Sequence, residues 1–344
     1  MSSMKFRLRK FLCALLFSLS MMGTPVLAKA HTRKKRPLPN SWDLIAQSLS
    51  GSSVPYQGKM ELTDFLNSSS SVSMTAIRFS PPHFYRREIF DGGGKVKEIA
   101  VSNGKEEWVY RRDTKEYWKM PAPAPLDAKK ELTTLRSNYK ASPPVRDRAA
   151  DRRALKIKLF SRKDHAMARI FWLDPKYGVV LKTEIYDDKG RLKYKSGFKK
   201  IRFFVRKPVP AKWFALNIPK KARSAQETLG IEGQSAQKKF GFPPLNPSWL
   251  PFGYALQEIR TLDHQGRAVI QEEFSDGINA LSLFEYKDTG SPFDGEKIPF
   301  LKGTAYLQHA SEGKVLSWKE GPLRLVLISS LDTEKILRIA GSIP

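Results

Sequence analysis

The sequence predicts an α+β protein that consists of a large antiparallel β-sheet with covering helices, followed by a smaller α+β domain. Two observations support this fold class. Alternating apolar and polar runs, separated by short turn sequences, recur from Lys59 to Phe204 and again after Pro243. Few stretches have helical spacing, so strands are expected to dominate both parts of the chain.

Residues 170–204 contain the clearest strand pattern. Three strands are expected here, joined by turns at 174–178 and 187–190. Each turn begins with Asp and ends with Gly, and the glycine accommodates the positive φ that closes such a turn. The segment therefore predicts three consecutive antiparallel strands.

The preceding part of the chain predicts a helix and a five-stranded meander. Residues 42–49 have helical spacing, with Ser41 as the expected N-cap. The meander is supported by the turns at Asp91–Gly94 and Asn103–Gly104. Its strands are expected at 59–65, 72–79, 83–90, 96–102 and 106–112.

A second helix is expected over residues 126–139, which end before Ser142-Pro143-Pro144. The basic stretch 146–153 is expected to be a solvated loop or a short helix, and strands resume at 154–160. This completes a first domain over residues 29–217.

Residues 218–242 are poor in apolar side chains and predict a linker. The second domain is then expected over residues 243–344. It ends in a helix capped by Asp332, with Ile336, Ile339 and Ala340 facing its sheet.

The first 28 residues predict an export signal. A basic start is followed by an apolar run from Phe11 to Met22 and a small-residue cleavage site at Val26-Leu27-Ala28. The run is shorter than the roughly 20 residues that span a bilayer. Export would remove Cys13, the single cysteine, so we expect a disulfide-free periplasmic protein.

The net charge of +26 is unevenly distributed along the chain. Residues 29–217 contain 41 basic and 19 acidic residues, whereas residues 218–344 contain 15 of each. A domain of that charge attracts polyanions. Export makes lipid phosphates, lipopolysaccharide or acidic protein segments the expected partners, rather than nucleic acid. A role of the charge in solubility alone stays open.

No pattern in the sequence predicts catalysis, a metal site or a cofactor. The five histidines are scattered, and Asp91-Gly92-Gly93-Gly94-Lys95 lacks the strand–loop–helix context of a phosphate-binding loop. We therefore predict a protein that is not an enzyme.

The aromatic residues of the first domain are the candidate site. They either fill a core or line an apolar pocket beneath a helical lid. The candidate pocket residues are Phe84, Trp108, Tyr110, Trp118, Leu132, Leu135 and Trp172. Arg86, Arg111, Lys193 and Lys195 are the candidate contacts to anionic groups at its rim. Strand alternation places Lys193 and Lys195 on one face and Tyr194 on the other.

Several short motifs, in this order and spacing, resemble the MucB/RseB family of periplasmic regulators. In the first domain they are Tyr56-Gln57-Gly58, Trp172-Leu173-Asp174-Pro175 and Asp187-Asp188-Lys189-Gly190. In the second they are Trp249-Leu250-Pro251-Phe252-Gly253-Tyr254, Phe274-Ser275-Asp276-Gly277 and Ile339-Ala340-Gly341-Ser342-Ile343. The chain departs from the family in its greater basicity and in residues 120–153.

The resemblance implies a non-enzymatic sensor of the sigma-E envelope stress response. Its first domain would be a LolA-like half-barrel that holds a lipid-like envelope ligand. Its second domain would bind the periplasmic segment of an anti-sigma factor. Two alternatives remain open, namely a periplasmic lipid or lipoprotein carrier and a polyanion-binding envelope protein.

Overall fold

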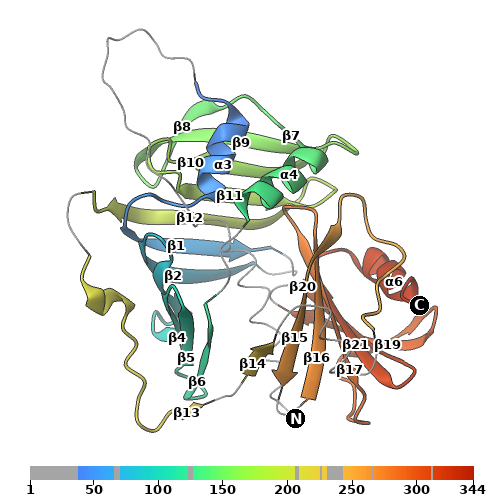
Figure 1. Cartoon of the computed structure of the whole chain (residues 1–344). Coiled ribbons are helices and arrows are strands. Elements are labelled where there is room, and N and C mark those ends of the chain that lie inside the picture. The colour runs from blue at the N-terminus through green and yellow to red at the C-terminus, as the bar shows by residue number, and fades with distance from the viewer. Residues whose placement is uncertain are drawn as a thin grey trace. The chain divides into compact units, whose positions relative to one another are not determined.

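The computed structural model describes residues 38–65, 70–122, 127–205, 209–224, 227–230, 243–264, 267–310 and 313–344. The predicted export signal and Cys13 lie outside these residues, as does much of the predicted linker. The described residues divide into two compact units, 38–224 and 227–344 (Figure 1). The division falls within the predicted linker 218–242, whose ends stay a prediction.

The first unit is built on a 13-stranded sheet. Its strands are β1 (Tyr56–Asp64), β2 (Ser71–Ser80), β3 (Phe84–Phe90), β4 (Val96–Asn103), β5 (Glu106–Arg111), β6 (Glu116–Pro121), β7 (Tyr139–Ala141), β8 (Val145–Ala149), β9 (Arg152–Ser161), β10 (Met167–Leu173), β11 (Val180–Tyr186), β12 (Leu192–Phe203) and β13 (Arg223–Ser224).

The order of these strands combines two antiparallel runs. Strands β1 to β6 follow one another as a meander, which confirms the five predicted strands and adds β6. The run β9 to β12 joins it through the antiparallel pair β1–β12, in which Tyr56 lies opposite Phe203. The prediction of a large antiparallel sheet with few helices, followed by a second sheet, is confirmed. Among the described strands of the first sheet, only β13 is parallel to its neighbour.

Two α-helices and a short 3-10 helix accompany the first sheet. Helix α3 spans Ser41–Leu49, α4 spans Ala128–Asn138 and η1 spans Ala211–Phe214. Helix α3 contacts α4 and β10, and α4 contacts β7. Figure 1 shows both α-helices lying across strands β9 to β11.

The N-cap of α3 differs from the prediction. Asn40 caps the helix, because its side-chain oxygen accepts a hydrogen bond from the Trp42 N–H at 2.8 Å. The Ser41 hydroxyl instead donates to the carbonyl oxygen of Ser142 at 2.6 Å and joins the helix to the β7–β8 connection. The prediction of Ser41 as the cap is therefore wrong by one residue.

The predicted loop or helix at 146–153 is also wrong, because β8 and β9 form a hairpin there. Ala150 and Asp151 make its two-residue turn with φ values of 51° and 56°. Paired positive φ values are typical of a type I′ turn, which usually carries Asn or Gly. The absence of those residues concealed the hairpin from sequence reasoning.

The second unit is built on an eight-stranded sheet in the order β14-β15-β16-β17-β21-β20-β19-β18. Its strands are β14 (Glu227–Gly230), β15 (Ala255–His264), β16 (Arg267–Ser275), β17 (Ala280–Lys287), β18 (Glu296–Phe300), β19 (Gly303–Ala310), β20 (Gly313–Glu320) and β21 (Leu323–Ser329).

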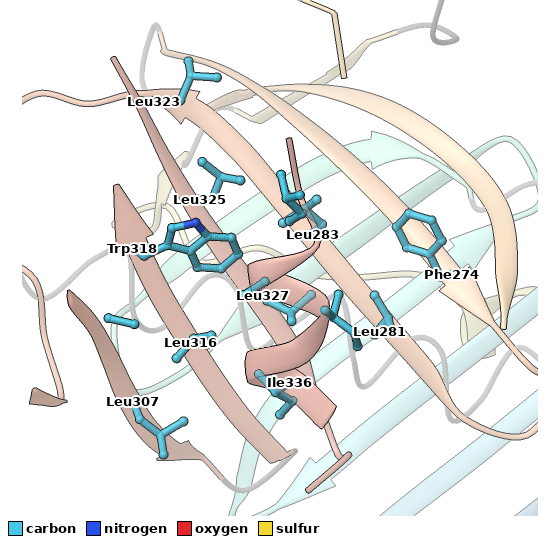
Figure 2. Close-up of a cluster of buried hydrophobic side chains, with 14 residues drawn as sticks. Phe274, Leu281, Leu283, Leu307, Leu316, Trp318, Leu323, Leu325, Leu327 and Ile336 are labelled. Atoms are coloured by element: carbon cyan, nitrogen blue, oxygen red, sulfur yellow. The ribbon is translucent and has the colours of Figure 1, made fainter. Parts of the chain in front are cut away.

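Helix α6 (Thr333–Gly341) packs on this sheet through the residues predicted for it. Asp332 caps the helix by accepting the Lys335 N–H at 2.9 Å. Ile336, Ile339 and Ala340 are fully buried in a core that also contains Trp318. Figure 2 shows Ile336 of this helix among the leucines of β17, β20 and β21.

Candidate functional site

The strand register of the first sheet separates its side chains into two faces. Residues directly opposite each other on neighbouring strands point to the same side. Following these pairs from β7 through β9 to β2 gives an apolar face and a basic face. The apolar face includes Tyr56, Phe79, Ile157, Phe171, Leu181 and Phe198. The basic face includes Lys59, Lys140, Lys158, Lys195, Lys200 and Arg202.

The apolar face is buried and closely packed. The six residues that define it are each less than a tenth exposed. The ring of Phe198 lies so near β1 that a Cβ atom at Gly58 would be 2.6 Å from its Cδ1 atom. The glycine of the Tyr56-Gln57-Gly58 motif therefore serves the close approach of β1 and β12.

The predicted pocket residues do not share one face. Val109 lies opposite Trp118, and Trp108 lies opposite Lys119, so Trp108 and Trp118 point to opposite sides of the sheet. Tyr110 shares the side of Trp108. The turn between β5 and β6 sets this register, which residue type alone did not reveal.

The same pair-by-pair assignment places Phe84 and Trp172 on the side of the basic face. From helix α4, Leu135 is fully buried and Leu132 is partly buried. The seven candidates thus belong to both faces and a helix. That any of them binds an apolar ligand stays a prediction.

Trp172 has structural partners on the basic face. Its indole N–H donates to Asp147 Oδ2 at 2.9 Å, and the Lys182 Nζ atom lies 4.0 Å from the centre of its ring. The backbone N–H of Arg148 and this indole N–H hold the pKa of Asp147 below its usual value. These contacts fix Trp172 between strands β8 and β11.

The four candidate anion contacts differ in exposure. Arg86 pairs with Glu88 at 2.6 Å and donates to the Ala215 carbonyl at 2.8 Å. Arg111 is buried and pairs with Asp113, and Lys193 is also buried. Lys195 is exposed and lies opposite Glu184 of β11. Of the four, only Lys195 presents an exposed charge.

A segment around η1 covers part of the basic-face side, which sequence reasoning missed. The Trp213 ring lies 5.2 Å from that of Phe204, and the Phe214 ring lies 5.6 Å from that of Phe84. Phe84 therefore contacts η1 instead of lining a pocket with Trp118.

The second unit contains two buried carboxylates that sequence reasoning also missed. Glu272 and Glu285 are both fully buried, on neighbouring strands and on the same face as Leu283. Glu285 Oε1 accepts the Leu245 N–H at 2.8 Å, and neither oxygen of Glu272 has a hydrogen-bond partner in the part of the chain that the structure describes. Burial raises the pKa of Glu272 to about 8 and that of Glu285 to about 7.

Among the described residues, no group of three or more His, Cys, Asp or Glu side chains is arranged to hold a metal ion. In the same part of the chain, no helix has both the length and the apolar character needed to cross a bilayer.

Comparisons with known proteins agree with this fold. Residues 87–214 match the family model of the MucB/RseB N-terminal domain. A crystal structure of MucB in complex with periplasmic MucA is 16% identical, with a TM-score of 0.52 over 87% of this chain and 94% of that one. The Pseudomonas aeruginosa MucA/MucB complex is also 16% identical, with a TM-score of 0.51 over 88% and 97%. No curated protein matches the chain by sequence.

Proposed function

We propose, from the match of residues 87–214 to the MucB/RseB N-terminal domain, that the protein is a periplasmic regulator that binds an anti-sigma factor. The family match over residues 87–214 is the observation that carries the proposal. The likeness in fold to MucB supports it, because that likeness covers most of both chains. Both of those structures are complexes with MucA.

The partner in this proposal is the periplasmic segment of an anti-sigma factor, bound through the second unit. Lipoprotein carriers usually lack such a second domain. A compact second sheet, with Trp318 at the centre of its core, therefore favours a regulator over a carrier. The proposal includes export by the signal at residues 1–28 and no enzymatic activity.

The ligand in this proposal is a lipid-like envelope molecule held by the first unit. Its open sheet is compatible with a half-barrel covered by α3 and α4. We place an acyl chain on the apolar face, where its binding would separate the packed rings of Tyr56, Phe79 and Phe198. A lipid or lipoprotein carrier is the alternative that this part of the chain also suits.

The first test is calorimetric titration of the full chain with the periplasmic segment of the anti-sigma factor from the same genome. We expect a one-to-one complex in the micromolar range or tighter. Phe252 and Leu301 are exposed apolar residues of the second unit. Replacing each with alanine and repeating the titration would show whether the segment contacts that residue. A folded chain that shows no heat of binding with the segment would contradict the regulator.

The second test is native mass spectrometry of the protein purified from the periplasm. Bound lipid that is displaced when the anti-sigma segment binds would support the sensor. Bound lipid with no response to the segment would support the carrier. A lipid-free protein would contradict both the carrier and the lipid-sensing hypotheses. The anti-sigma interaction would then be decided by the first test.

A further inference from the structure

The basic face of the first sheet carries more exposed charge than its carboxylates neutralise, and we propose that it docks the protein on the surface of an anionic phospholipid bilayer. Its six defining cations are exposed, and none forms an ion pair with a described carboxylate. This surface goes beyond the proposed function, because binding an anti-sigma segment requires no bilayer.

The placement of these cations does not stabilise the sheet. Lys59 lies directly opposite Lys200 on the neighbouring strand, and like charges at such positions destabilise a sheet. The acidic residues of this face already have other partners. Glu61 pairs with Lys199 at 2.9 Å, and Glu184 pairs with Lys182 at 2.7 Å.

The electrostatics of Glu184 are consistent with this excess of cations. Partial burial of the carboxylate raises its pKa, but hydrogen bonds from Lys182 and Tyr186 and the charges of Lys182 and Lys195 lower the pKa by more. The pKa of Glu184 is therefore lowered. The carboxylate stays ionised at periplasmic pH, and the cations around it still outnumber it.

The shape of the surface favours a bilayer over a soluble polyanion. Strands β9 to β1 are five neighbours in the sheet, so their cations spread over about 20 Å. Two exposed valines share the face, because Val72 lies opposite Thr63 and Val145 lies opposite Lys156. Apolar side chains among lysines suit the headgroup region of a membrane, whereas a soluble polyanion offers them no contact.

The test is sedimentation of the full chain with phosphatidylcholine vesicles, with and without 40% phosphatidylglycerol in roughly 0.1 M salt. The test variant carries Lys59→Gln, Lys158→Gln, Lys195→Gln and Lys200→Gln. The matched control carries Lys95→Gln, Lys105→Gln, Lys115→Gln and Lys189→Gln, which lose the same charge from exposed turns. All proteins are purified from the periplasm by the same procedure, so any contribution of residues 1–28 is the same in each.

We expect the wild-type chain and the control to bind the anionic vesicles and the test variant to lose more than 100-fold of that affinity, since each lysine contributes about five-fold at such a surface. Binding to the anionic vesicles should weaken as salt rises. Equal losses in the test and control variants would assign binding to net charge and overturn the proposal. Loss of binding to soluble polyphosphate by the test variant, with vesicle binding retained, would also overturn it.

Binding of the anti-sigma segment is measured on the same proteins without vesicles. The test variant should bind the segment as the wild type does. Its failure to bind vesicles is therefore distinguishable from a failure of the proposed regulator.

Discussion

The two sheets bury ionisable groups in different ways. In the first, Arg169 of β10 is only 4% exposed and forms no ion pair with a described carboxylate. Its Nε–H donates to Thr183 Oγ1 at 3.0 Å, and its guanidinium carbon lies 4.2 Å from the centre of the Phe171 ring. In the second, Glu272 and Glu285 are fully buried, and Glu285 accepts a hydrogen bond from the Leu245 N–H, whereas Glu272 has no hydrogen-bond partner among the described residues.

The two kinds of group respond differently to the cost of burying a charge. Burial lowers the pKa of Arg169 to about 10, which leaves the side chain charged at neutral pH. A glutamate avoids the same cost by taking up a proton. The first sheet therefore retains the buried charge of Arg169 across the physiological pH range, whereas the second sheet binds and releases protons within that range.

The greatest change in stability is predicted for the second sheet alone, as a dependence of its stability on pH. Because burial raises both carboxyl pKa values from 4.5, the folded sheet binds more protons than the unfolded chain between about pH 4.5 and 8. Its stability is therefore greatest below that window and falls as pH rises through it, by an amount on the order of 5 kcal/mol. Hydrogen exchange of β16 and β17, corrected for intrinsic rates, should show protection falling from pH 5.5 to 8.5, while β10 and β11 stay protected.

The double variant Glu272→Gln with Glu285→Gln is the control for this pH dependence. Glutamine keeps an oxygen that accepts the Leu245 N–H, and it has no charge to lose. Protection of β16 and β17 should then be independent of pH. Equal protection of the wild-type second sheet at pH 5.5 and pH 8.5 would contradict the prediction, because it would show that Glu272 and Glu285 do not change the stability of the sheet in this range.

A smaller effect is expected from Arg169→Met in the first sheet. Methionine fills a similar volume without a buried charge, so we expect the first unit to gain about 1–2 kcal/mol in its free energy of unfolding. Arg152→Met is the matched control, since Arg152 also lies over an aromatic ring, that of Phe203, at 4.6 Å.

The two arginine variants should change the free energy of unfolding in opposite directions. Arg152 pairs at 3.0 Å with Asp174, which is 2% exposed, and its loss leaves that carboxylate without its ion pair. We expect that change to cost about 2 kcal/mol in urea-induced unfolding. A loss of stability in Arg169→Met as large as in Arg152→Met would mean that Thr183 and Phe171 compensate fully for burying the charge.

Local patterns predicted much of the fold. The turns at 174–178 and 187–190 are present, with Gly178 and Gly190 at positive φ, and Asp332 caps the last helix. In these cases the residue type and the backbone conformation are linked directly. The β8–β9 hairpin was missed because Ala150 and Asp151 adopt positive φ without glycine.

The candidate site was harder to predict because it depends on register and tertiary contacts. Trp118 lies opposite Val109 and not opposite Trp108, and this difference of one residue in register puts Trp108 and Trp118 on opposite faces of the sheet. Two further features depend on segments far apart in the sequence. They are the burial of Arg111 and Lys193 and the contact of Phe84 with Phe214. The pair Glu272 and Glu285 sits in strands that read as ordinary half-exposed ones, so no local signal distinguished it.

The weakest of these changes, Tyr85→Phe, tests whether a single hydrogen bond explains why a buried carboxylate of the first sheet differs from those of the second. Glu107 of the first sheet is 7% exposed, and the Tyr85 hydroxyl donates to its Oε1 atom at 2.6 Å. Burial and the neighbouring Glu107 raise the pKa of Tyr85, so the tyrosine remains a donor. Tyr85→Phe removes that donor and should cost about 1 kcal/mol in urea-induced unfolding at pH 8.

The informative readout for Tyr85→Phe is the change in this cost with pH. With one donor fewer, the burial of a charge at Glu107 is less well compensated, as at Glu272. The cost should then be smaller at pH 5 than at pH 8, because a protonated Glu107 no longer buries a charge. An identical cost at both pH values would show that the other contacts of Glu107 hold it ionised, so that the contrast between the sheets does not depend on Tyr85.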